Sequence, residues 1–389
     1  MPGWHVLTQP YAERGLLNVV GIIQEQHPER ARLFMQWKEM GWPLLVDSLN
    51  LLGVSGAPIT LFLDEAGVIQ AVDPRPSDLA SFIEEKPASW DSEAWLPPSS
   101  DALLTDLDSE SGRAGLDLQF LWGGELGLSA AILGYQKILA ETPQDAKAHF
   151  RLGVSYRSRY DSAGREEADF QLAVKHWGNA LQLNPNQYIW RRRIQQYGPR
   201  LAKPYSFYDW IHEARREILD RGDQPVALGV EPGGAEFAHP EAKFGTEALD
   251  VEDPDAEGRI HRDSAQLVGM EVVAVPDSIN RGDAVRIHVM LRPDQKRKVH
   301  WNNEVEDLIL WVDGEEDWQV EKNLHRYQVP EEPVTFESRR LEFEVKTADQ
   351  GPSGDREIRG YVLYYVCEDV NGQCLYRRQD FSVPVRIKE

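Results

Sequence analysis

The sequence predicts a multidomain protein that combines an α/β part, an α-helical part and an antiparallel β-sandwich. The chain has 389 residues, which is more than a single hydrophobic core usually organises. Its hydrophobic pattern passes from short apolar runs to helical periodicity and then to strand-like alternation. Acidic stretches rich in Pro, Gly or Ser separate these patterns. We therefore predict five segments: an α/β domain at 1–88, a linker at 89–122, helical repeats at 123–222, a second linker at 223–260 and the sandwich at 261–389.

The composition indicates a folded, acidic protein. Hydrophobic residues make up 41% of the chain, and its formal net charge is −22. This charge argues against a nucleic-acid partner, because phosphate binding relies on clustered Lys and Arg. No apolar run approaches the roughly eighteen residues of a membrane helix, and the first residues lack the features of a signal peptide. We expect no membrane span; the compartment is left unknown, with an extracytoplasmic one slightly favoured because of the single cysteine pair.

The first segment alternates short apolar runs with one helical pattern. β-branched residues and flanking Gly and Pro mark the strands, and periodic apolar residues mark the helix. The predicted elements are a buried parallel strand at 16–23, a helix at 29–40, extended structure at 43–47, a strand at 61–63 and a turn at 64–67 that leads into 68–70.

The pattern Val54-x-Gly56-x-Pro58-x-Thr60, followed by a strand and by Asp64-x-x-Gly67, resembles the second half of thioredoxin-like reductases of the TlpA type. The resemblance implies a cis peptide bond before Pro58, a costly feature that places backbone beside a redox site. The alternative is that Pro58 is an ordinary proline at the start of a strand.

The same family implies a Cys-x-x-Cys motif at the start of its first long helix, where the helix N-terminus lowers a thiol's pKa. This sequence has no such motif, and the stretch from Met1-Pro2 to Gly15-Leu16 matches in spacing the part of the family that comes after the motif. Three explanations are open: a degenerate lobe, a truncated sequence or misplaced start codon, and a selenocysteine motif whose UGA codon is read as stop. We expect truncation rather than degeneracy, because half a thioredoxin fold lacks the packing of its missing strand and helix.

Two related sets of residues recur in the helical segment. Ala131, Tyr135, Ile138 and Pro143 are repeated as Ala173, Trp177, Ala180 and Pro185. Together with Leu152-Gly153 and Tyr156, this pattern resembles tetratricopeptide repeats. The period of 42 residues exceeds the usual 34 or so, and we assign the surplus to a loop inserted at 160–168. The resemblance implies a concave surface that binds a partner protein, with a helical spacer as the alternative.

A basic and aromatic run follows the second repeat. It consists of Trp190-Arg191-Arg192-Arg193, Tyr197, Tyr205, Phe207, Tyr208 and Trp210. These side chains would form a face for an anion or an acidic partner. Alternatively, the aromatic residues cap the repeat core and the arginines pair with acidic groups of the protein itself.

Strand-like alternation dominates the last segment. Turn residues separate the alternating runs, as in antiparallel sandwiches. The predicted strands include 286–291, 307–312, 341–345, 360–366 and 381–387.

The sequence contains two cysteines, Cys367 and Cys374. They are too few for a zinc site built on thiolates, and we expect no metal or other cofactor. Asn371-Gly372 is a strong turn signal. A loop that lies wholly between the cysteines would place them opposite each other at bridging distance, whereas a tight turn at Asn371-Gly372 would place them diagonally.

The stretch from Tyr361 to Cys374 resembles the N-terminal domain of the thiol:disulfide interchange protein DsbD. That domain is an immunoglobulin-like sandwich, which passes electrons through a cysteine pair on adjacent strands. Here the spacing between the cysteines is slightly longer, and Leu375-Tyr376-Arg377-Arg378 replaces the family's aromatic and proline context. The pair is therefore either an exchange pair or a structural staple worth about 2 kcal/mol.

Our leading hypothesis is a thiol-disulfide oxidoreductase or electron relay that acts on a thiol or disulfide substrate. Cys367 and Cys374 would exchange, Pro58 would shape the N-terminal site, and the helical repeats would position a partner protein. The alternative is a non-enzymatic adaptor with a degenerate thioredoxin-like lobe. A peroxidase of the peroxiredoxin type is less favoured, because the sequence has no Pro-x-x-x-Thr-x-x-Cys arrangement.

Overall fold

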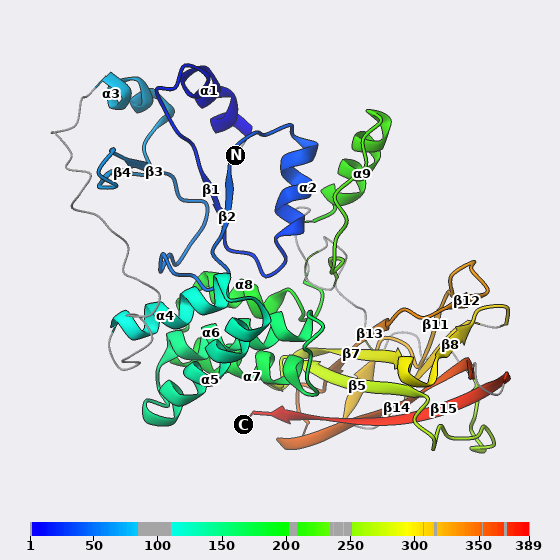
Figure 1. Cartoon of the computed structure of the whole chain (residues 1–389). Helices are drawn as coiled ribbons and strands as arrows, with labels where there is room; N and C mark the ends of the chain where they lie inside the picture. The colour runs from blue at the N-terminus through cyan, green and yellow to red at the C-terminus, as the bar shows by residue number, and fades with distance from the viewer. Residues whose placement is uncertain are drawn as a thin grey trace. The chain divides into compact units, whose positions relative to one another are not determined.

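The computed structural model describes residues 2–84, 110–201, 208–233, 236, 244, 251–305, 307–314, 317–351, 353–368 and 372–388. The chain forms two compact units, each assembled from segments that are apart in the sequence. Unit 1 comprises Met1–Arg165, Asn179–Arg193 and Ser206–Pro232, and unit 2 comprises Glu166–Gly178, Ile194–Tyr205 and Gly233–Glu389. Helices and antiparallel sheets occur together, which confirms the mixed multidomain class (Figure 1).

Unit 1 holds four strands of three or four residues and most of the helices that the structure describes. Its elements are α1 (Pro2–Glu13), β1 (Gly21–Ile23), α2 (Glu29–Trp37), β2 (Leu44–Val46), β3 (Leu61–Leu63), β4 (Ile69–Val72), η1 (Pro76–Asp78), α3 (Leu79–Glu84), α4 (Glu110–Trp122), α5 (Gly124–Glu141), α6 (Ala146–Tyr160) and α9 (Trp210–Asp220). The helices α7 (Asp169–Leu183) and α8 (Tyr188–Gln195) have residues in both units.

The strands of unit 1 form two small sheets. β1 runs parallel to β2, and β3 pairs antiparallel with β4. The predicted strand at 16–23 is a strand only from Gly21, because the three residues of β2 offer no partner to the residues before it. Apolar side chains of the parallel pair remain accessible, with Ile22 44% and Leu45 56% exposed.

The helix α2 packs against α9 through aromatic side chains. The rings of Trp37 and Trp210 are stacked with centroids 5.8 Å apart, and Trp37 Nε1 donates to Glu217 Oε2 at 2.6 Å. The helix ends at Trp37 rather than at the predicted Met40, since Glu39 adopts a positive φ of 51° that interrupts helical geometry.

The helix α4 corrects the prediction of a linker at 89–122. Its Leu116 and Asp117 are buried, and the Asp117 carboxylate accepts hydrogen bonds from Tyr135 Oη and from Arg151 Nη1. A Cβ on Gly134 of α5 would lie 2.3 Å from Leu116, so this glycine permits the close approach of α4 and α5. The apolar periodicity of α4 is weak, because the buried carboxylate of Asp117 interrupts the apolar face of this helix. Residues 85–109 of the predicted linker lie outside the described residues.

Six of the eight repeat positions noted in the sequence are buried, and the two prolines, Pro143 and Pro185, are exposed. Ala131, Tyr135, Ile138, Ala173, Trp177 and Ala180 are each at most 4% exposed. The predicted insertion at 160–168 corresponds to the irregular segment between α6 and α7. Spacing therefore identified the buried faces of these helices.

Unit 2 contains all the longer strands. Its elements are β5 (Val268–Val275), β6 (Ser278–Ile279), β7 (Ala284–Pro293), η5 (Gln295–Arg297), β8 (Val299–Asn302), β9 (Leu308–Val312), β10 (Trp318–Val320), β11 (Leu324–Tyr327), β12 (Val334–Thr335), β13 (Arg339–Thr347), β14 (Gly354–Glu368) and β15 (Gln373–Ile387).

These strands form two sheets that share one hydrophobic core. One sheet has the order β10-β13-β7-β5, and the other has the order β11-β9-β14-β15-β6 with β8 and β12 joined through β14. All pairs are antiparallel except β15 with β6. The core draws Ile287 and Phe343 from the first sheet, and Trp301 and Val362 from the second. Period-2 alternation predicted these strands, because every second side chain of a strand such as β7 or β13 faces the core. The opposite face is also partly buried, since Arg286, His288 and Glu344 are each at most 9% exposed.

Part of the predicted second linker is packed against the larger sheet. Asp255 is 6% exposed; its carboxylate accepts from Ile260 N at 3.1 Å and from Arg378 Nη1 at 2.8 Å. Ile260 packs against a small apolar cluster on the outer face of that sheet. The sequence did not predict this packing, because Arg378 of β15, which binds Asp255, lies more than 100 residues away in the chain.

Among the helices in the described part of the chain, none combines the length and apolar character needed to cross a bilayer.

Candidate functional site

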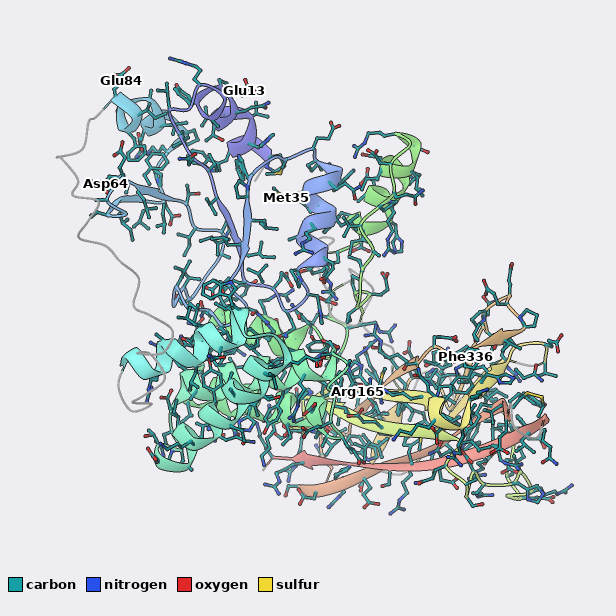
Figure 2. All side chains as sticks on the ribbon, viewed as in Figure 1. Glu13, Met35, Asp64, Glu84, Arg165 and Phe336 are labelled. Carbon is teal, nitrogen blue, oxygen red and sulfur yellow. A yellow bond between two sulfur atoms is a disulfide. The ribbon has the colours of Figure 1, made fainter. Side chains whose placement is uncertain are left out.

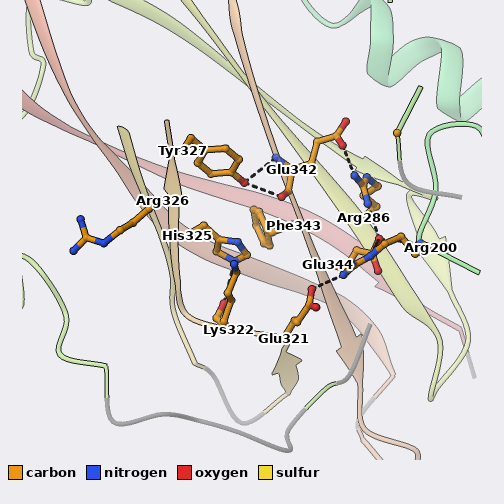
Figure 3. Close-up of a pocket in the computed structure, with 11 residues that line it drawn as sticks. Arg200, Arg286, Glu321, Lys322, His325, Arg326, Tyr327, Glu342, Phe343 and Glu344 are labelled. Carbon is orange, nitrogen blue, oxygen red and sulfur yellow. Dashed lines mark hydrogen bonds and ion pairs between the residues drawn. The ribbon is translucent and has the colours of Figure 1, made fainter. Parts of the chain in front are cut away.

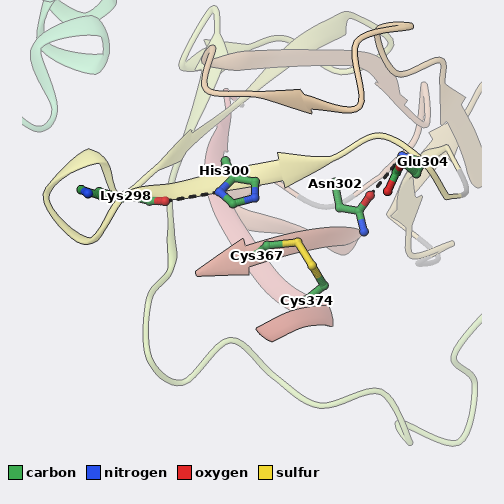
Figure 4. Close-up of a disulfide and its surroundings, with 6 residues drawn as sticks. All are labelled: Lys298, His300, Asn302, Glu304, Cys367 and Cys374. Carbon is green, nitrogen blue, oxygen red and sulfur yellow. Dashed lines mark hydrogen bonds between the residues drawn. A yellow bond between two sulfur atoms is a disulfide. The ribbon is translucent and has the colours of Figure 1, made fainter. Parts of the chain in front are cut away.

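The two cysteines lie at one end of the β14–β15 hairpin. The strand register pairs Cys367 directly with Cys374 and Glu368 with Gln373. A disulfide joins the cysteines, whose Cα atoms are 4.0 Å apart (Figure 4). Of the two arrangements that the sequence left open, the structure therefore has the directly opposed pair and not the diagonal one.

The disulfide lies on the sheet face that points away from the main core. Val366 and Leu375, the neighbours of the two cysteines, contribute to the core, and side chains alternate between faces along a strand. Cys367 is 4% exposed, whereas Cys374 is exposed. Cys374 is thus the more accessible residue of the pair, and Cys367 is the shielded one.

Two stacked tyrosines lie beside the disulfide on the same face of the sheet. The rings of Tyr365 and Tyr376 are stacked, with centroids 4.3 Å apart and 23° between their planes. Each tyrosine lies two residues from a cysteine on its own strand. The stack continues into the outer cluster through Tyr376, which packs against Trp311 and its neighbours.

His300 is a neighbour of the cysteine pair that the sequence did not indicate. It lies on β8, directly opposite Cys367 of β14. Figure 4 shows its imidazole beside Cys367. The two residues are 67 positions apart in the sequence, and no local pattern reports the pairing of β8 with β14, so only the strand register reveals this neighbour.

Pro58 belongs to unit 1, whereas both cysteines belong to unit 2. The Ala57–Pro58 peptide bond is cis, as the resemblance implied, and Pro58 is exposed just ahead of β3. The turn that follows β3 is held by Asp64, whose Oδ1 accepts from Val68 N at 2.9 Å and from Ala66 N at 3.0 Å (Figure 2). The hydrogen bond from Val68 is the main reason why the pKa of Asp64 is below its ordinary value.

Arg193 and Trp190 of the basic and aromatic run in α8 contact other residues of unit 1. Arg193 is 1% exposed and donates to Gln26 Oε1, Gln24 O and Ser48 O at 2.7, 3.0 and 3.2 Å. Trp190 is also buried and stacks on Phe150. These two side chains support the fold rather than a surface for anions, and the three acceptors named above for Arg193 are neutral oxygens. Tyr205 and Phe207 lie outside the described residues.

A cluster of ionic side chains lines a cavity of about 420 Å³ in unit 2 (Figure 3). The guanidinium of Arg286 binds Glu342, and it donates to Glu344 Oε1 at 2.6 Å. Arg200 binds the same Glu344 carboxylate through its backbone N–H at 2.9 Å and its Nε at 3.3 Å. Tyr327 Oη donates to the Glu342 carbonyl at 2.8 Å. The charges in this cavity already compensate one another, so its lining does not define one class of ligand.

The charge on Glu342 is strongly favoured by its neighbours. Burial alone would raise the pKa of this carboxyl, but His288, Arg286 and Arg340 around it hold the pKa well below the ordinary value of 4.5. The His288 Nδ1 is 3.0 Å from Glu342 Oε1. A group with a depressed carboxyl pKa stabilises the fold above its unfolded-state pKa, and this stabilisation is lost as the pH falls.

His325, at the edge of the same cavity, should make stability depend on pH. Burial and the nearby positive charges of Lys322 and Arg200 lower its pKa from 6.5 to about 4. Because the folded state resists protonation, unfolding should become easier by at most about 3 kcal/mol as the pH falls from about 6.5 to about 4. His325→Gln keeps a donor for the Lys322 carbonyl, which His325 Nε2 contacts at 3.0 Å, and should flatten this slope.

Urea unfolding of unit 2 across this pH range measures the slope. His261→Gln is the matched control, since His261 is exposed in the same unit, and it should keep the wild-type slope. An unchanged slope in His325→Gln would show that His325 is not its source.

Within the described ranges, no group of three or more His, Cys, Asp or Glu side chains is arranged to hold a metal ion. We take the disulfide and its surroundings as the candidate site, because a disulfide is a group that a thiolate can attack.

Comparison with known proteins adds no assignment. No protein-family model matches the chain, and no curated protein matches it. Solved structures with local similarity include a FixG-related protein from Vibrio parahaemolyticus (14% identity, 32% of this chain and 98% of that chain, TM-score 0.16). Others are AvmM, which catalyzes macrocyclization in alchivemycin A biosynthesis (15% identity, 32% and 91%, TM-score 0.18), and the sporulation control protein Spo0M from Bacillus subtilis (11% identity, 31% and 50%, TM-score 0.17). TM-scores this low carry no information on the fold or function of this chain.

Proposed function

We propose that the chain is a thiol-disulfide exchange protein in which Cys367 and Cys374 are the exchange pair. The observation that carries this proposal is the asymmetry of the disulfide: it joins an exposed Cys374 to a Cys367 that is 4% exposed, at the turn end of the β14–β15 hairpin. Exchange requires a thiolate to approach one sulfur while the other departs. A staple that only closes a loop has no need of an accessible sulfur.

The reaction follows from this asymmetry. A partner thiolate attacks Cys374 Sγ, a mixed disulfide forms, and the Cys367–Cys374 bond breaks with its electron pair remaining on Cys367 Sγ. A second thiolate of the partner then attacks the partner's own sulfur in the mixed disulfide and releases Cys374 as a thiolate. The partner dithiol is oxidised to a disulfide, and this chain is reduced to two thiols.

We also assign domains as part of this proposal. Residues 1–88 are a thioredoxin-like lobe, supported by the parallel β1–β2 pair, α2 and the cis bond at Pro58 ahead of β3. Residues 123–222 are tetratricopeptide-like repeats that position a partner protein, supported by the buried repeat positions. Residues 261–389 are an immunoglobulin-like sandwich that resembles the DsbD N-terminal domain, supported by two sheets around one core.

The alternative is a non-enzymatic adaptor, and exposed apolar side chains in unit 1 favour it. On α5, Leu126 is 86% and Leu133 is 67% exposed, and a spacing of seven residues places them on one face of the helix. Trp122, at the end of α4, is 77% exposed. Apolar groups in such positions mark protein interaction surfaces. In an adaptor, the cysteine pair would be only a staple.

The reactivity of the separate cysteines tests the proposed exchange. In Cys367→Ser the remaining Cys374 should react with a small aromatic disulfide at least about 100-fold faster than the remaining Cys367 does in Cys374→Ser, because exchange depends on access to the sulfur. Stopped-flow absorbance measures both rates.

Each single variant loses the same disulfide, so the two proteins are matched controls for each other. Each should lose about 2 kcal/mol of stability through loss of the closed loop. Equal rates, or a faster reaction at Cys367, would contradict the proposed point of attack and favour the adaptor.

A further inference from the structure

We infer that His300 holds and returns the proton of Cys367 during exchange, an inference that rests on the function proposed above. The strand β14 is flanked by β15 on one side and β8 on the other. Their registers place Cys374 on one side of Cys367 and His300 on the other. Cys367 therefore lies between its disulfide partner and His300.

All three side chains lie on the same face of the sheet. Residues directly opposite each other on antiparallel strands point to the same side, with Cβ atoms about 4.5–5.5 Å apart. The neighbouring pair, Val366 and Trp301, points into the core and is fully buried. A slip of one residue would expose Trp301, so the core fixes the register that brings His300 to Cys367.

The hydrogen bonding of His300 leaves one nitrogen for this role. Its Nδ1 is 3.4 Å from the Lys298 carbonyl oxygen. A carbonyl only accepts hydrogen bonds, so this contact favours the proton on Nδ1 and leaves Nε2 as the nitrogen that gains and loses a proton. The amide oxygen of Asn302 does not compete for it, since it accepts from Glu304 N at 3.0 Å. The imidazole is half-buried, which keeps it open to proton exchange with water.

Charged groups near Cys367 and His300 influence, in opposite senses, which of these two residues holds the proton. Lys298 lies two residues before His300, just ahead of β8, and its ammonium favours a thiolate and disfavours an imidazolium. Glu304 is near the other end of β8, and Glu368 follows Cys367 opposite Val299. These carboxylates act in the opposite sense, so the contribution of His300 has to be separated from that of Lys298.

The proton step accompanies the first exchange. When the partner thiolate bonds to Cys374 Sγ, Cys367 Sγ leaves with the electron pair of the broken bond. The imidazolium stabilises this thiolate and gives it the Nε2 proton, which yields a neutral thiol and a neutral imidazole. In the reverse direction the imidazole removes the thiol proton, and the thiolate attacks the mixed disulfide. A nearby imidazolium lowers a thiol's pKa, and a thiol of lower pKa leaves faster.

The test compares the reduction of the full-length wild type with that of His300→Gln and His300→Asn by dithiothreitol across a range of pH. His300→Asn keeps an amide donor near the Nδ1 position for the Lys298 carbonyl, and neither variant has a titrating nitrogen. After correction for the thiolate fraction of the reagent, both variants should be about tenfold slower than the wild type at acidic pH. The ratio should approach one as the pH rises.

A second readout is the pKa of the Cys367 thiol in the Cys374→Ser background, measured from the pH dependence of alkylation. Adding His300→Asn should raise this pKa. Lys298→Gln is the matched control for a neighbouring charge; it should keep the wild-type pH dependence of the reduction rate.

The outcomes separate this inference from the function on which it rests. A wild-type disulfide that resists dithiothreitol at every pH overturns the proposed function itself. If the wild type is reduced and both His300 variants have the same pH profile as the wild type, only the role of His300 is overturned. Loss of the pH dependence in Lys298→Gln with its retention in His300→Asn would assign the effect to Lys298 instead.

Discussion

Replacing Arg286 with methionine is expected to lower the free energy of unfolding of unit 2 by about 3–5 kcal/mol. The guanidinium is buried between the carboxylates of Glu342 and Glu344, and the latter is 2% exposed. Its removal leaves two carboxylates with less compensation in a site that excludes water. Methionine fills a similar volume, so the loss reports on charge rather than on a cavity.

Hydrogen exchange of the β7 and β13 amides measures this loss locally. Arg386→Met is the matched control, because Arg386 forms an exposed ion pair with Asp355 on neighbouring strands of the same unit. Exposed pairs contribute little, and this variant should leave the protection of β7 and β13 unchanged. A decrease for Arg286→Met no larger than that of the control would show that the buried cluster does not hold the sheet together.

Replacing Arg193 with methionine is expected to cost unit 1 about 3–5 kcal/mol. This guanidinium is the shared donor for Gln26, Gln24 and Ser48, and its acceptors would lose a charged partner in a buried site. The variant should therefore loosen α8 from the α/β elements that carry these acceptors.

Protection of the α8 amides against hydrogen exchange is the readout. Arg191→Met is the control, since Arg191 is exposed on the same helix and its side chain donates to the Pro185 carbonyl at 2.7 Å. The control should leave protection unchanged. If both variants behave alike, Arg193 is not a structural centre of unit 1, and its availability for a ligand would have to be reconsidered.

Local patterns account for the elements that the sequence predicted well. The strand β3 lies at its predicted bounds, Leu61–Leu63, because three apolar residues lie between two turn signals. The strands β7 and β13 contain their predicted runs, because their alternating apolar residues supply the side chains that face the shared core.

Non-local contacts explain what the sequence did not reveal. Sequence patterns place the helix α4 in a linker, because its burial depends on Tyr135 and Arg151, which neutralise its buried Asp117. The packing of residues near Asp255 likewise depends on Arg378, far along the chain. A local window contains neither partner.

The same distinction applies to the candidate site. Asn371-Gly372 and the cysteine spacing predict a hairpin that brings Cys367 and Cys374 together, since all these residues lie within one short segment. His300 enters the site through the pairing of β8 with β14, which no local pattern predicts. In the sequence His300 resembles any other strand residue, so its neighbourhood is visible only in the fold.

The most direct test of the proposed function is the equilibrium reduction potential of the Cys367–Cys374 disulfide in the full-length protein. Redox buffers and alkylation of the free thiols, followed by mass measurement, give the midpoint. The proposed exchange function predicts a midpoint between about −270 and −120 mV, the range of proteins that exchange disulfides with partners. A midpoint below about −300 mV, typical of structural disulfides, would contradict the exchange function and leave the pair as a staple of the β14–β15 hairpin.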